Sequence, residues 1–285
     1  MEPTKEIDLA LRPVRPTDRD RVEEMTRDVW EGRDYVPQVF DRWVSDAGSS
    51  FQAAEVEGVV VGVQRVRPYA PGLLWYEGLR VASTHRRRGI ASVMLTSAIA
   101  AAREQGFGEM RLGTANADAI SLFEKAGFKR LVDIRWWRAT RVEGGEPARI
   151  PDPSESERLW SAISNSPGLE LYSGVAADMT GAHNLRAAEL ARLAGLGMLR
   201  AAPGGRAIAG LRRSWSENMS VAFIAGRGGV LRDLLFALRY EADADGADHV
   251  TIAVPRGHPA ADDLSACGYD FVNADDKAGV YGLKL

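Results

Sequence analysis

The sequence predicts an α/β or α+β fold made of two similar units, each with a mixed central sheet flanked by helices. Strand-like and helix-like segments alternate along the chain, which is typical of that class. The interval from Gly89 to Gly127 nearly equals the interval from Gly229 to Gly268, and such duplication indicates two related units. Between them, residues 143–153 (EGGEPARIPDP) are rich in Gly, Pro and charged residues. We therefore expect a first domain over 1–142, a linker over 143–153 and a second domain over 154–285.

Apolar periodicity and turn residues place the elements of the first half. The clearest is a helix with an apolar stripe that includes Ile90, Val93 and Met94. The expected elements are a strand over 7–14, a helix from Thr17 or Asp18 to about Trp30, a helix over Asp34–Gly48, strands over 51–56, 59–68 and 73–81, a helix over Ile90–Glu104, a strand over 109–115, a helix over Asp118–Ala126 and a strand over 128–140.

The second half repeats this order with weaker signals. Its expected elements are helices over Ser154–Ser164 and Thr180–Leu193, strands over 197–202, 206–215 and 218–226, a helix over Val230–Asp243, a strand over 249–255, a helix over Pro259–Ala266 and strands to the C-terminus.

The bulk composition excludes several classes of protein. The 285 residues carry a net charge of −3, whereas proteins that mainly bind nucleic acid present strongly basic faces. Cys267 is the one cysteine and the four histidines lack metal-ligand spacing, so we expect no disulfide and no metal site. No segment reaches the ~18 apolar residues of a membrane span, and the first ten residues lack the apolar core of a signal peptide. We expect a cytoplasmic monomer or homodimer that binds neither nucleic acid nor membrane.

The stretch LRVASTHRRRGIASVM (Leu79–Met94) leads from a strand through a loop into a helix. The first-turn N–H groups of a helix and its dipole attract phosphate, and Gly89 would let a ligand approach the backbone closely. Arg86, Arg87 and Arg88 could pair with that phosphate, although a solvated basic turn is the simpler interpretation of the arginines alone. Neither a P-loop nor a GxGxxG motif is present.

Two motifs carry a family resemblance. Residues 86–91 (RRRGIA) resemble the R/Q-x-x-G-x-G/A loop of the GCN5-related N-acetyltransferases (GNAT), and Asn116 with 119–128 (AISLFEKAGF) resembles their N..A..LYEK.GF segment. The resemblance implies acetyl-CoA as co-substrate. It also implies that the strand before the loop diverges from its neighbour, so that the Val81 N–H can bond the acetyl carbonyl. The implied coenzyme-binding residues are Leu79, Arg80, Val81, Arg86, Arg87, Arg88, Gly89, Ile90, Ala91, Asn116 and Phe123.

A narrower resemblance concerns the acceptor. DYVP (34–37), Phe40, Trp43 and EGLRV (77–81) are similar to the histidine N-acetyltransferase group. This implies a small-molecule amine as acceptor, such as the α-amine of a free amino acid. A polyamine, an antibiotic or a protein amine remains an alternative. Aromatic side chains here could stack on a flat or cationic acceptor, although most large aromatics are core residues. The candidate acceptor-binding residues are Trp30, Tyr35, Trp43 and Tyr76.

Glu77 is the candidate general base. Strict alternation along 73–81 puts Leu73, Trp75, Glu77, Leu79 and Val81 on one face, where Glu77 is the one charge. Burial raises the pKa of a carboxyl group and makes it a better base near neutrality, and an incoming ammonium must lose a proton before it attacks. The alternative is a structural ion pair with Arg80 or with an arginine on a neighbouring strand. Gly78 could also mark a bulge that breaks the alternation.

Phe123 departs from the family pattern, which usually has tyrosine there as the acid for the departing thiolate. Phe123 cannot donate a proton, so Tyr35 or Tyr76 could substitute, or the thiolate could leave unaided. Phe123 could equally be a core aromatic. The second half has neither a carboxylate nor the RxxGxA frame at the matching positions, so we expect a degenerate domain without turnover. A ligand of its own at GRGG (226–229) is an alternative, and an acetyl-CoA-binding sensor is the non-enzyme alternative.

Overall fold

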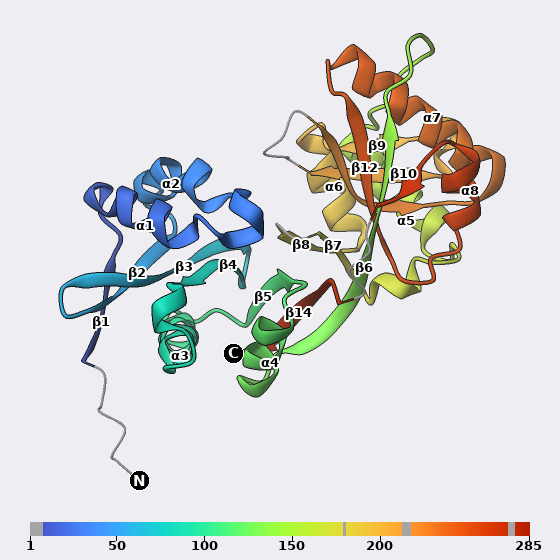
Figure 1. The fold of residues 1–285 in the computed structure, drawn as a ribbon. Coiled ribbons are helices and arrows are strands. Elements are labelled where there is room, and N and C mark those ends of the chain that lie inside the picture. The colour runs from blue at the N-terminus through green and yellow to red at the C-terminus, as the bar shows by residue number, and fades with distance from the viewer. Residues whose placement is uncertain (1–7, 179–180, 213–217, 273–276) are drawn as a thin grey trace. The chain divides into compact units, whose positions relative to one another are not determined.

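The computed structural model describes residues 8–178, 181–212, 218–272 and 277–285. The chain is a mixed α/β protein in which mixed sheets are flanked by helices (Figure 1), as the sequence predicts. It forms two compact units: the first contains Met1–Leu112, Asp118–Lys129 and Gly282–Leu285, and the second contains Gly113–Ala117 and Arg130–Tyr281.

In the first unit, the strands pair antiparallel from β1 to β4, and β4 pairs parallel with β5. Helices α1 and α2 cover one face of these strands and α3 covers the other (Figure 1). The elements are β1 (Leu9–Pro13), η1 (Pro16–Asp18), α1 (Arg19–Thr26), η2 (Val29–Gly32), α2 (Val36–Ser45), β2 (Ser50–Val56), β3 (Val59–Ala70), β4 (Leu73–Val81), η3 (Ser83–His85), α3 (Ile90–Glu104), β5 (Glu109–Thr114) and α4 (Ala117–Lys125).

Two apolar clusters fix the faces of this unit. The α2 face packs around Phe40, Trp43 and Phe51. The α3 face packs Ile90 and Met94 on small and β-branched side chains of the strands. Met94 and Ile90 belong to the predicted apolar stripe of this helix, and burial of such a stripe against a sheet stabilises both elements.

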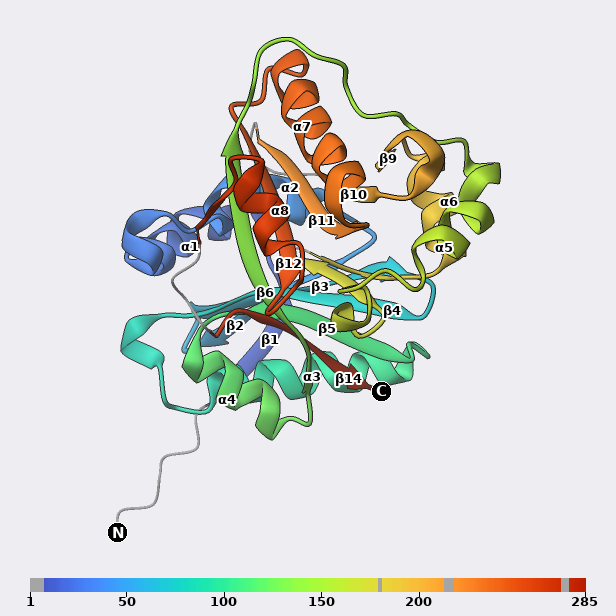
Figure 2. The same ribbon diagram turned by 90° about the vertical axis from the view of Figure 1, so that its right-hand side faces the viewer.

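The second unit shares one strand–helix–strand connection with the first. A helix, α7, connects two parallel strands, β11 and β12, as α3 connects β4 and β5. Figure 2 shows α7 and α8 on one side of these strands. The elements are β6 (Lys129–Thr140), η4 (Pro153–Glu155), α5 (Ser156–Ile163), η5 (Glu170–Tyr172), β7 (Val175–Asp178), β8 (Gly181–Asn184), α6 (Ala187–Gly195), β9 (Leu199–Ala201), η6 (Pro203–Gly205), β10 (Ile208–Arg212), β11 (Met219–Ala225), α7 (Gly228–Ala244), β12 (His249–Pro255), α8 (Ala261–Ala266), β13 (Asp270–Phe271) and β14 (Gly279–Lys284).

The helix predicted over Thr180–Leu193 is wrong in its first half. The chain forms a hairpin of β7 and β8 there, and α6 begins only at Ala187. Residues Gly181–Asn184 pair antiparallel with Val175–Asp178 across the hairpin, and this pairing prevails over the helical spacing farther on. Thr180 itself lies outside the described residues.

The boundary between the two compact units does not lie at residues 143–153. Most of β6 belongs to the second unit, where it pairs antiparallel with β12 from Thr140 back to Ile134. The end of the chain returns to the first unit, where Lys284 Nζ lies 2.7 Å from Glu109 Oε2 and the Leu285 N–H donates to the Gly108 carbonyl at 3.1 Å. The first unit therefore includes residues from both ends of the sequence.

His258 gives the second unit a pH dependence. Its ring is 4% exposed, Nδ1 accepts a hydrogen bond from the Ala260 N–H at 3.2 Å, and the ring packs edge-on against Tyr172. Burial lowers the pKa of His258 to about 4 from its ordinary 6.5. Because the unfolded chain binds this proton more readily, stability should fall as the pH drops from 6.5 toward 4, by about 2 kcal/mol at pH 5.

Denaturant unfolding of the second unit at pH 7.5 and pH 5.0 checks this. The comparison is between wild type and His258→Asn, whose amide oxygen can still accept from Ala260, with His249→Asn as the control. The loss at pH 5.0 should shrink in His258→Asn and persist in His249→Asn. Equal losses in wild type and His258→Asn would contradict the assignment.

Candidate active site

The parallel strands β4 and β5 diverge beside the candidate site. Their register covers Leu73↔Glu109 to Trp75↔Arg111, whereas β4 continues to Val81. Ala82 donates its N–H to the Val61 carbonyl on β3 at 2.8 Å. Because the N–H groups of a strand alternate in direction, the N–H of Val81 points away from β3, toward the opening. The divergence implied by the family resemblance is thus present.

A bulge at Gly78 changes which side chains share a face of β4. The register with β3 passes from Val63↔Arg80 to Arg65↔Glu77, so β4 contains one extra residue, and Gly78 has φ +69°. The prediction that Glu77, Leu79 and Val81 share a face is therefore wrong. Glu77 lies on the α2 face, whereas Leu79 and Val81 pack with the α3 cluster.

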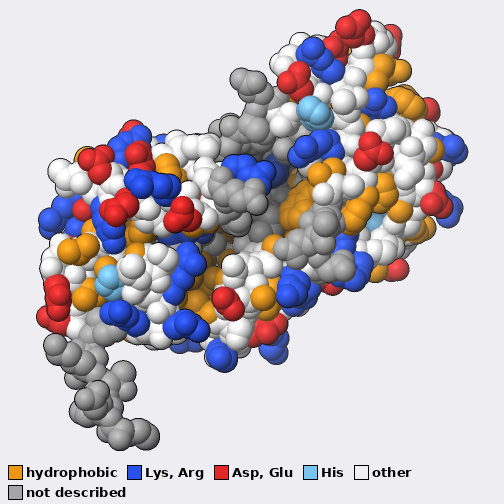
Figure 3. All heavy atoms as spheres, in the orientation of Figure 1, with side chains coloured by type: hydrophobic (Ala, Val, Ile, Leu, Met, Phe, Trp, Pro, Cys, Tyr) orange, Lys and Arg blue, Asp and Glu red, His pale blue; other side chains and the backbone are white. Residues whose placement is uncertain are grey.

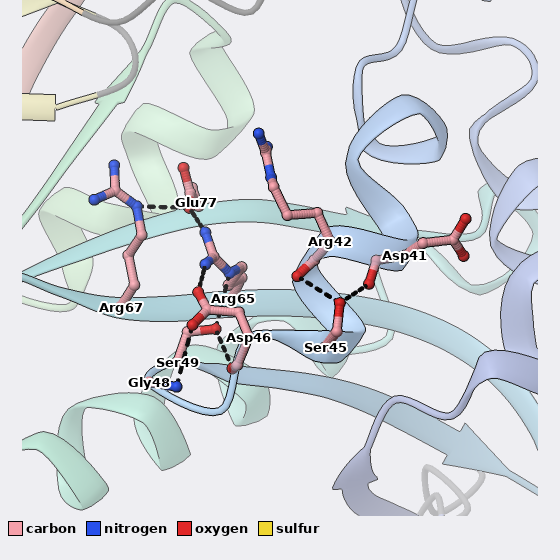
Figure 4. Close-up of polar contacts among 9 residues, drawn as sticks. All are labelled: Asp41, Arg42, Ser45, Asp46, Gly48, Ser49, Arg65, Arg67 and Glu77. Carbon is pink, nitrogen blue, oxygen red and sulfur yellow. Dashed lines mark hydrogen bonds and ion pairs between the residues drawn. The ribbon is translucent and has the colours of Figure 1, made fainter.

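Glu77 is buried, but it is not the isolated charge that the sequence predicts on this face of β4. Its side chain is 8% exposed, and Oε1 accepts hydrogen bonds from Arg65 and, at 3.0 Å, from Arg67 Nε (Figure 4). Both arginines lie on the neighbouring strand β3, as the ion-pair alternative anticipated. Among the described residues, Oε2 accepts no hydrogen bond. The arginines therefore bind the carboxylate at Oε1, and Oε2 is the oxygen that could accept a proton.

Arg65 is the centre of this network. It is 4% exposed, and it donates to Glu77, to Asp46 and, at 3.1 Å, to Ser49 Oγ. Its guanidinium carbon lies 4.9 Å from the ring centroid of Trp43. Burial would raise the pKa of Asp46, but hydrogen bonds from Ser49 and Gly48 and the charge of Arg65 outweigh it and lower that pKa. Asp46 thus stays ionised and compensates part of the buried positive charge.

Arg80 and Asp34 link the two segments of the narrower family resemblance. Arg80 Nε and Nη2 donate to the two carboxylate oxygens of Asp34 at 2.6 and 3.0 Å, and Asp34 also accepts from the Val36 N–H at the start of α2. The predicted coenzyme-binding residue Arg80 therefore lies on the α2 face with its guanidinium bound by Asp34. This pair fixes the N-terminus of α2 to β4.

The candidate acceptor-binding aromatics do not form one wall. Trp43 is 2% exposed and covers Gly78, where an added Cβ would lie 2.7 Å from its ring. Tyr35 meets Trp43 edge-on at 5.8 Å, and burial raises the pKa of Tyr35 to about 12. Tyr76 lies on the other face of β4. The backbone of Trp30 lies in η2, and its side chain is outside the described part of the chain.

Tyr76 and Phe123 are core residues of the α3 face. Tyr76 is 2% exposed, donates to Gln64 Oε1 at 2.9 Å and meets Phe123 edge-on at 5.7 Å. Burial raises the pKa of Tyr76 far above its ordinary value. Phe123 is 4% exposed and also packs against Phe128. Phe123 thus packs as a core aromatic residue, which is the alternative role given for it above.

The arginine loop has the geometry of an anion site. Arg86, Arg87, Arg88 and Gly89 are exposed, and Gly89 is the N-cap of α3 with φ +81°. A Cβ at Gly89 would meet nothing within 4 Å, so the space in front of the helix start is open. The first-turn N–H groups of a helix, here those of 90–92, lack intrahelical acceptors and favour negative charge. The loop therefore fits a diphosphate.

The matching helix start in the second unit is bound by the chain itself. The Gly228 N–H donates to Asp263 Oδ2 at 3.1 Å, and the other Asp263 oxygen lies 3.4 Å from Arg232 Nε. A carboxylate of the protein thus takes the place at which an external phosphate would bind.

Asn116 lies in the loop after β5, where its N–H donates to Thr114 Oγ1 at 3.1 Å. It belongs to the second unit, whereas the other candidate residues belong to the first.

The described residues contain no group of three or more His, Cys, Asp or Glu side chains placed to hold a metal ion. No described helix has the length and apolar character needed to cross a membrane. On the face drawn in Figure 3, basic and acidic side chains are interspersed.

Sequence reasoning did not identify by number the ion-pair partners that organise the site, which are Asp34, Asp46, Arg65 and Arg67. Arg65 and Arg67 alternate along a strand whose other residues are mostly apolar, and that pattern was the available signal. The two residues became assignable only with the register of β3 against β4.

Part of the chain is similar to a known family and to several curated proteins. Residues 18–128 match the model of the Acetyltransferase (GNAT) family. Among curated proteins, a 95-residue segment is 36% identical to N-acetyltransferase 8 from Homo sapiens, covering 31% of this chain and 42% of that protein. A 79-residue segment is 33% identical to histidine N-acetyltransferase from Oreochromis niloticus, covering 27% and 23%. The chain thus spans less than half the length of these relatives.

Solved structures share the fold over nearly the whole chain. A GCN5-related N-acetyltransferase from Sphaerobacter thermophilus has a TM-score of 0.63 at 12% identity and covers 97% of this chain and 95% of its own. A second, from Kribbella flavida, has a TM-score of 0.51 at 16% identity and covers 98% and 71%. These likenesses concern the fold of both units.

Proposed function

We propose that the protein is an acetyl-CoA-dependent N-acetyltransferase that acts on a primary amine of a small molecule, such as the α-amine of a free amino acid. The observation that carries the proposal is the opening between β4 and β5, with the Val81 N–H directed into it and an exposed helix start, Gly89–Ile90, next along the chain. The family match over residues 18–128 and the two curated relatives support the same chemistry.

In this mechanism, the α3 start binds the coenzyme diphosphate through the backbone N–H groups of 90–92, with Arg86 to Arg88 as added positive charge. Leu79 and Val81 line the acetyl and pantetheine path on the α3 face. The Val81 N–H donates to the acetyl carbonyl oxygen and stabilises the negative charge that develops there.

Glu77 takes the proton of the attacking ammonium. The amine then attacks the thioester carbon, the C–S bond breaks, and coenzyme A leaves as thiolate, which a thiol of pKa about 8.5 does tolerably without an acid. The second unit supplies no second reaction site, because Asp263 already binds its matching helix start.

An acceptor screen tests the proposal. Release of free coenzyme A from acetyl-CoA is measured against a panel of amino acids that includes histidine, and against polyamines, aminoglycosides and peptide N-termini. Acceptor-dependent release with an amino acid is the expected result. Coenzyme binding without release for any acceptor would contradict the proposal and identify a coenzyme sensor instead.

Tyr76→Phe tests whether Tyr76 supplies the missing acid. The Tyr76 hydroxyl is buried on Gln64 and its pKa is raised, so we expect kcat to stay within about twofold while stability falls by about 1 kcal/mol, from the lost hydrogen bond. Steady-state kinetics and thermal unfolding measure the two effects. Tyr35→Phe is the parallel variant, and a large loss of kcat in either one would identify it as the acid.

A further inference from the structure

We propose that Gln64 is a positioning residue for the coenzyme, because it fixes the N-terminus of α3, which binds the diphosphate, relative to the Val81 N–H of β4, which binds the acetyl carbonyl. The inference rests on the proposed function and adds to it a residue that is 0% exposed. Acetyl-CoA spans both places, so its diphosphate can help to orient its thioester only if α3 and β4 keep a fixed separation.

The side-chain amide of Gln64 joins β3 to three other elements. Its Nε2 donates to the Met94 carbonyl of α3 at 2.9 Å and to Gln52 Oε1 of β2 at 3.0 Å, while its Oε1 accepts from the Tyr76 hydroxyl of β4 at 2.9 Å. A carbonyl oxygen only accepts, so the amide nitrogen must face Met94. Both amide hydrogens are then in use, and the side chain cannot turn away without leaving a buried polar group unpaired, which is costly.

The hydrogen bond to Met94 fixes α3 close to its diphosphate-binding end. Gly89 is the N-cap and Ile90 the first helical residue, so Met94 lies in the second turn, about 6 Å along the axis from Ile90. A carbonyl oxygen has two lone pairs, so this one can accept from Gln64 as well as from the helix backbone. The position of this turn therefore determines where the N–H groups of 90–92 lie.

Gly62 allows α3 to approach β3 at the same place. It lies two residues before Gln64, and a Cβ on it would lie 3.0 Å from Met94 Sδ and 3.1 Å from the Arg80 carbonyl oxygen. Both distances are shorter than an ordinary van der Waals contact. Met94 is therefore positioned twice, by the packing of its side chain beside Gly62 and by the hydrogen bond to its carbonyl, and this limits both rotation and sliding of α3.

Gln64 also lies beside the part of β4 that leads to the acetyl site. The β3 residues on either side of it pair with Arg80 and Glu77, so Gln64 lies opposite the bulge at Gly78. After the bulge, Val81 packs on the α3 face, which is also the face of the Gln64 amide. One buried side chain thus connects the strand of the acetyl site with the helix of the diphosphate site.

The test compares a whole donor with a truncated one. Acetyl-CoA carries the diphosphate and S-acetylpantetheine does not, so only acetyl-CoA depends on the placement of α3 against β4. We call the ratio of their kcat/KM values, measured with one acceptor, the diphosphate advantage. Gln64→Met has a similar side-chain length and loses the three hydrogen bonds. It should lower the diphosphate advantage by about tenfold or more, while kcat/KM with S-acetylpantetheine stays within about threefold of wild type.

Thr26→Val is the matched control. Thr26 is buried in α1 and its hydroxyl donates to the Val22 carbonyl of the same helix at 2.8 Å, so valine removes a buried hydrogen bond that links no helix to the sheet. Gln64→Met and Thr26→Val should both lose stability in thermal unfolding, and only Gln64→Met should lose the diphosphate advantage. Tyr76→Phe leaves the hydrogen bond to Met94 in place and should keep the advantage within about threefold.

Gly62→Ala acts on α3 without removing a hydrogen-bonding group, so the test does not depend on the folding of Gln64→Met. Its added methyl group should displace Met94 and lower the diphosphate advantage by about threefold or more. An unchanged advantage in Gln64→Met, or in Gly62→Ala if Gln64→Met does not fold, would overturn the inference. Equal losses with both donors would also overturn it, because they would show a purely structural role.

These outcomes leave the proposed function standing. No acetyl transfer by wild type from either donor would contradict the proposed function instead. The ratio of the affinities for coenzyme A and pantetheine, measured by calorimetric titration, then replaces the diphosphate advantage in the same variants, with the same expected fall and the same contrary result.

Discussion

Glu77→Gln is expected to lower kcat by about 100-fold or more, because the amide cannot accept the proton that the attacking ammonium must lose. Coenzyme affinity should stay within about twofold, since Glu77 lies on the α2 face and the diphosphate loop begins at Arg86. Glutamine keeps the length of the side chain and an oxygen for Arg67, and Arg65 keeps Asp46 as a partner, so the fold should persist. Steady-state kinetics give kcat, and calorimetric titration with coenzyme A gives the affinity.

Glu55→Gln is the matched control for this variant. Glu55 lies on β2 and pairs with Arg12 at 2.7 Å, so the same change removes a carboxylate from an ion pair of the same sheet at a distance from the opening. Equal losses of kcat in the two variants would indicate a structural effect. An unchanged kcat in Glu77→Gln would remove Glu77 from the mechanism.

Gly89→Val is expected to weaken coenzyme binding by about 100-fold, because the branched side chain would fill the approach to the first-turn N–H groups and several charge-assisted hydrogen bonds would be lost. The open space in front of Gly89 means that the valine would not clash within the protein. Its cost to the fold is the left-handed backbone at φ +81°, about 1–2 kcal/mol for a residue with a Cβ.

Gly58→Val separates backbone strain from ligand contact. Gly58 has φ +77° and open space around its Cβ position, but it lies in the turn between β2 and β3. Both variants should lose similar stability in thermal unfolding, and only Gly89→Val should lose affinity for coenzyme A. Retained affinity in Gly89→Val would place the diphosphate elsewhere.

The sequence was most informative where local pattern and local chemistry coincide. The helix over Ile90–Glu104 and its glycine start were predictable because periodicity and φ preference depend on neighbouring residues. The faces of β4 were not, since one bulge at Gly78 reversed the alternation after Glu77. The ion pairs of Glu77 and Arg80 join residues that are 10 to 46 positions apart, and only strand register and the placement of α2 bring them together.

The return of the chain end to the first unit has a consequence for the order of folding. During synthesis, β5 is complete long before Gly282–Leu285 emerge. The backbone hydrogen-bonding groups of β5 and the Glu109 carboxylate therefore lack these partners while the second unit is made. An edge strand without its neighbour invites pairing with other chains. A fragment that ends near residue 142 would keep that edge permanently, so the candidate site is best studied in a chain that includes Gly282–Leu285, which belong to the same compact unit as Glu77.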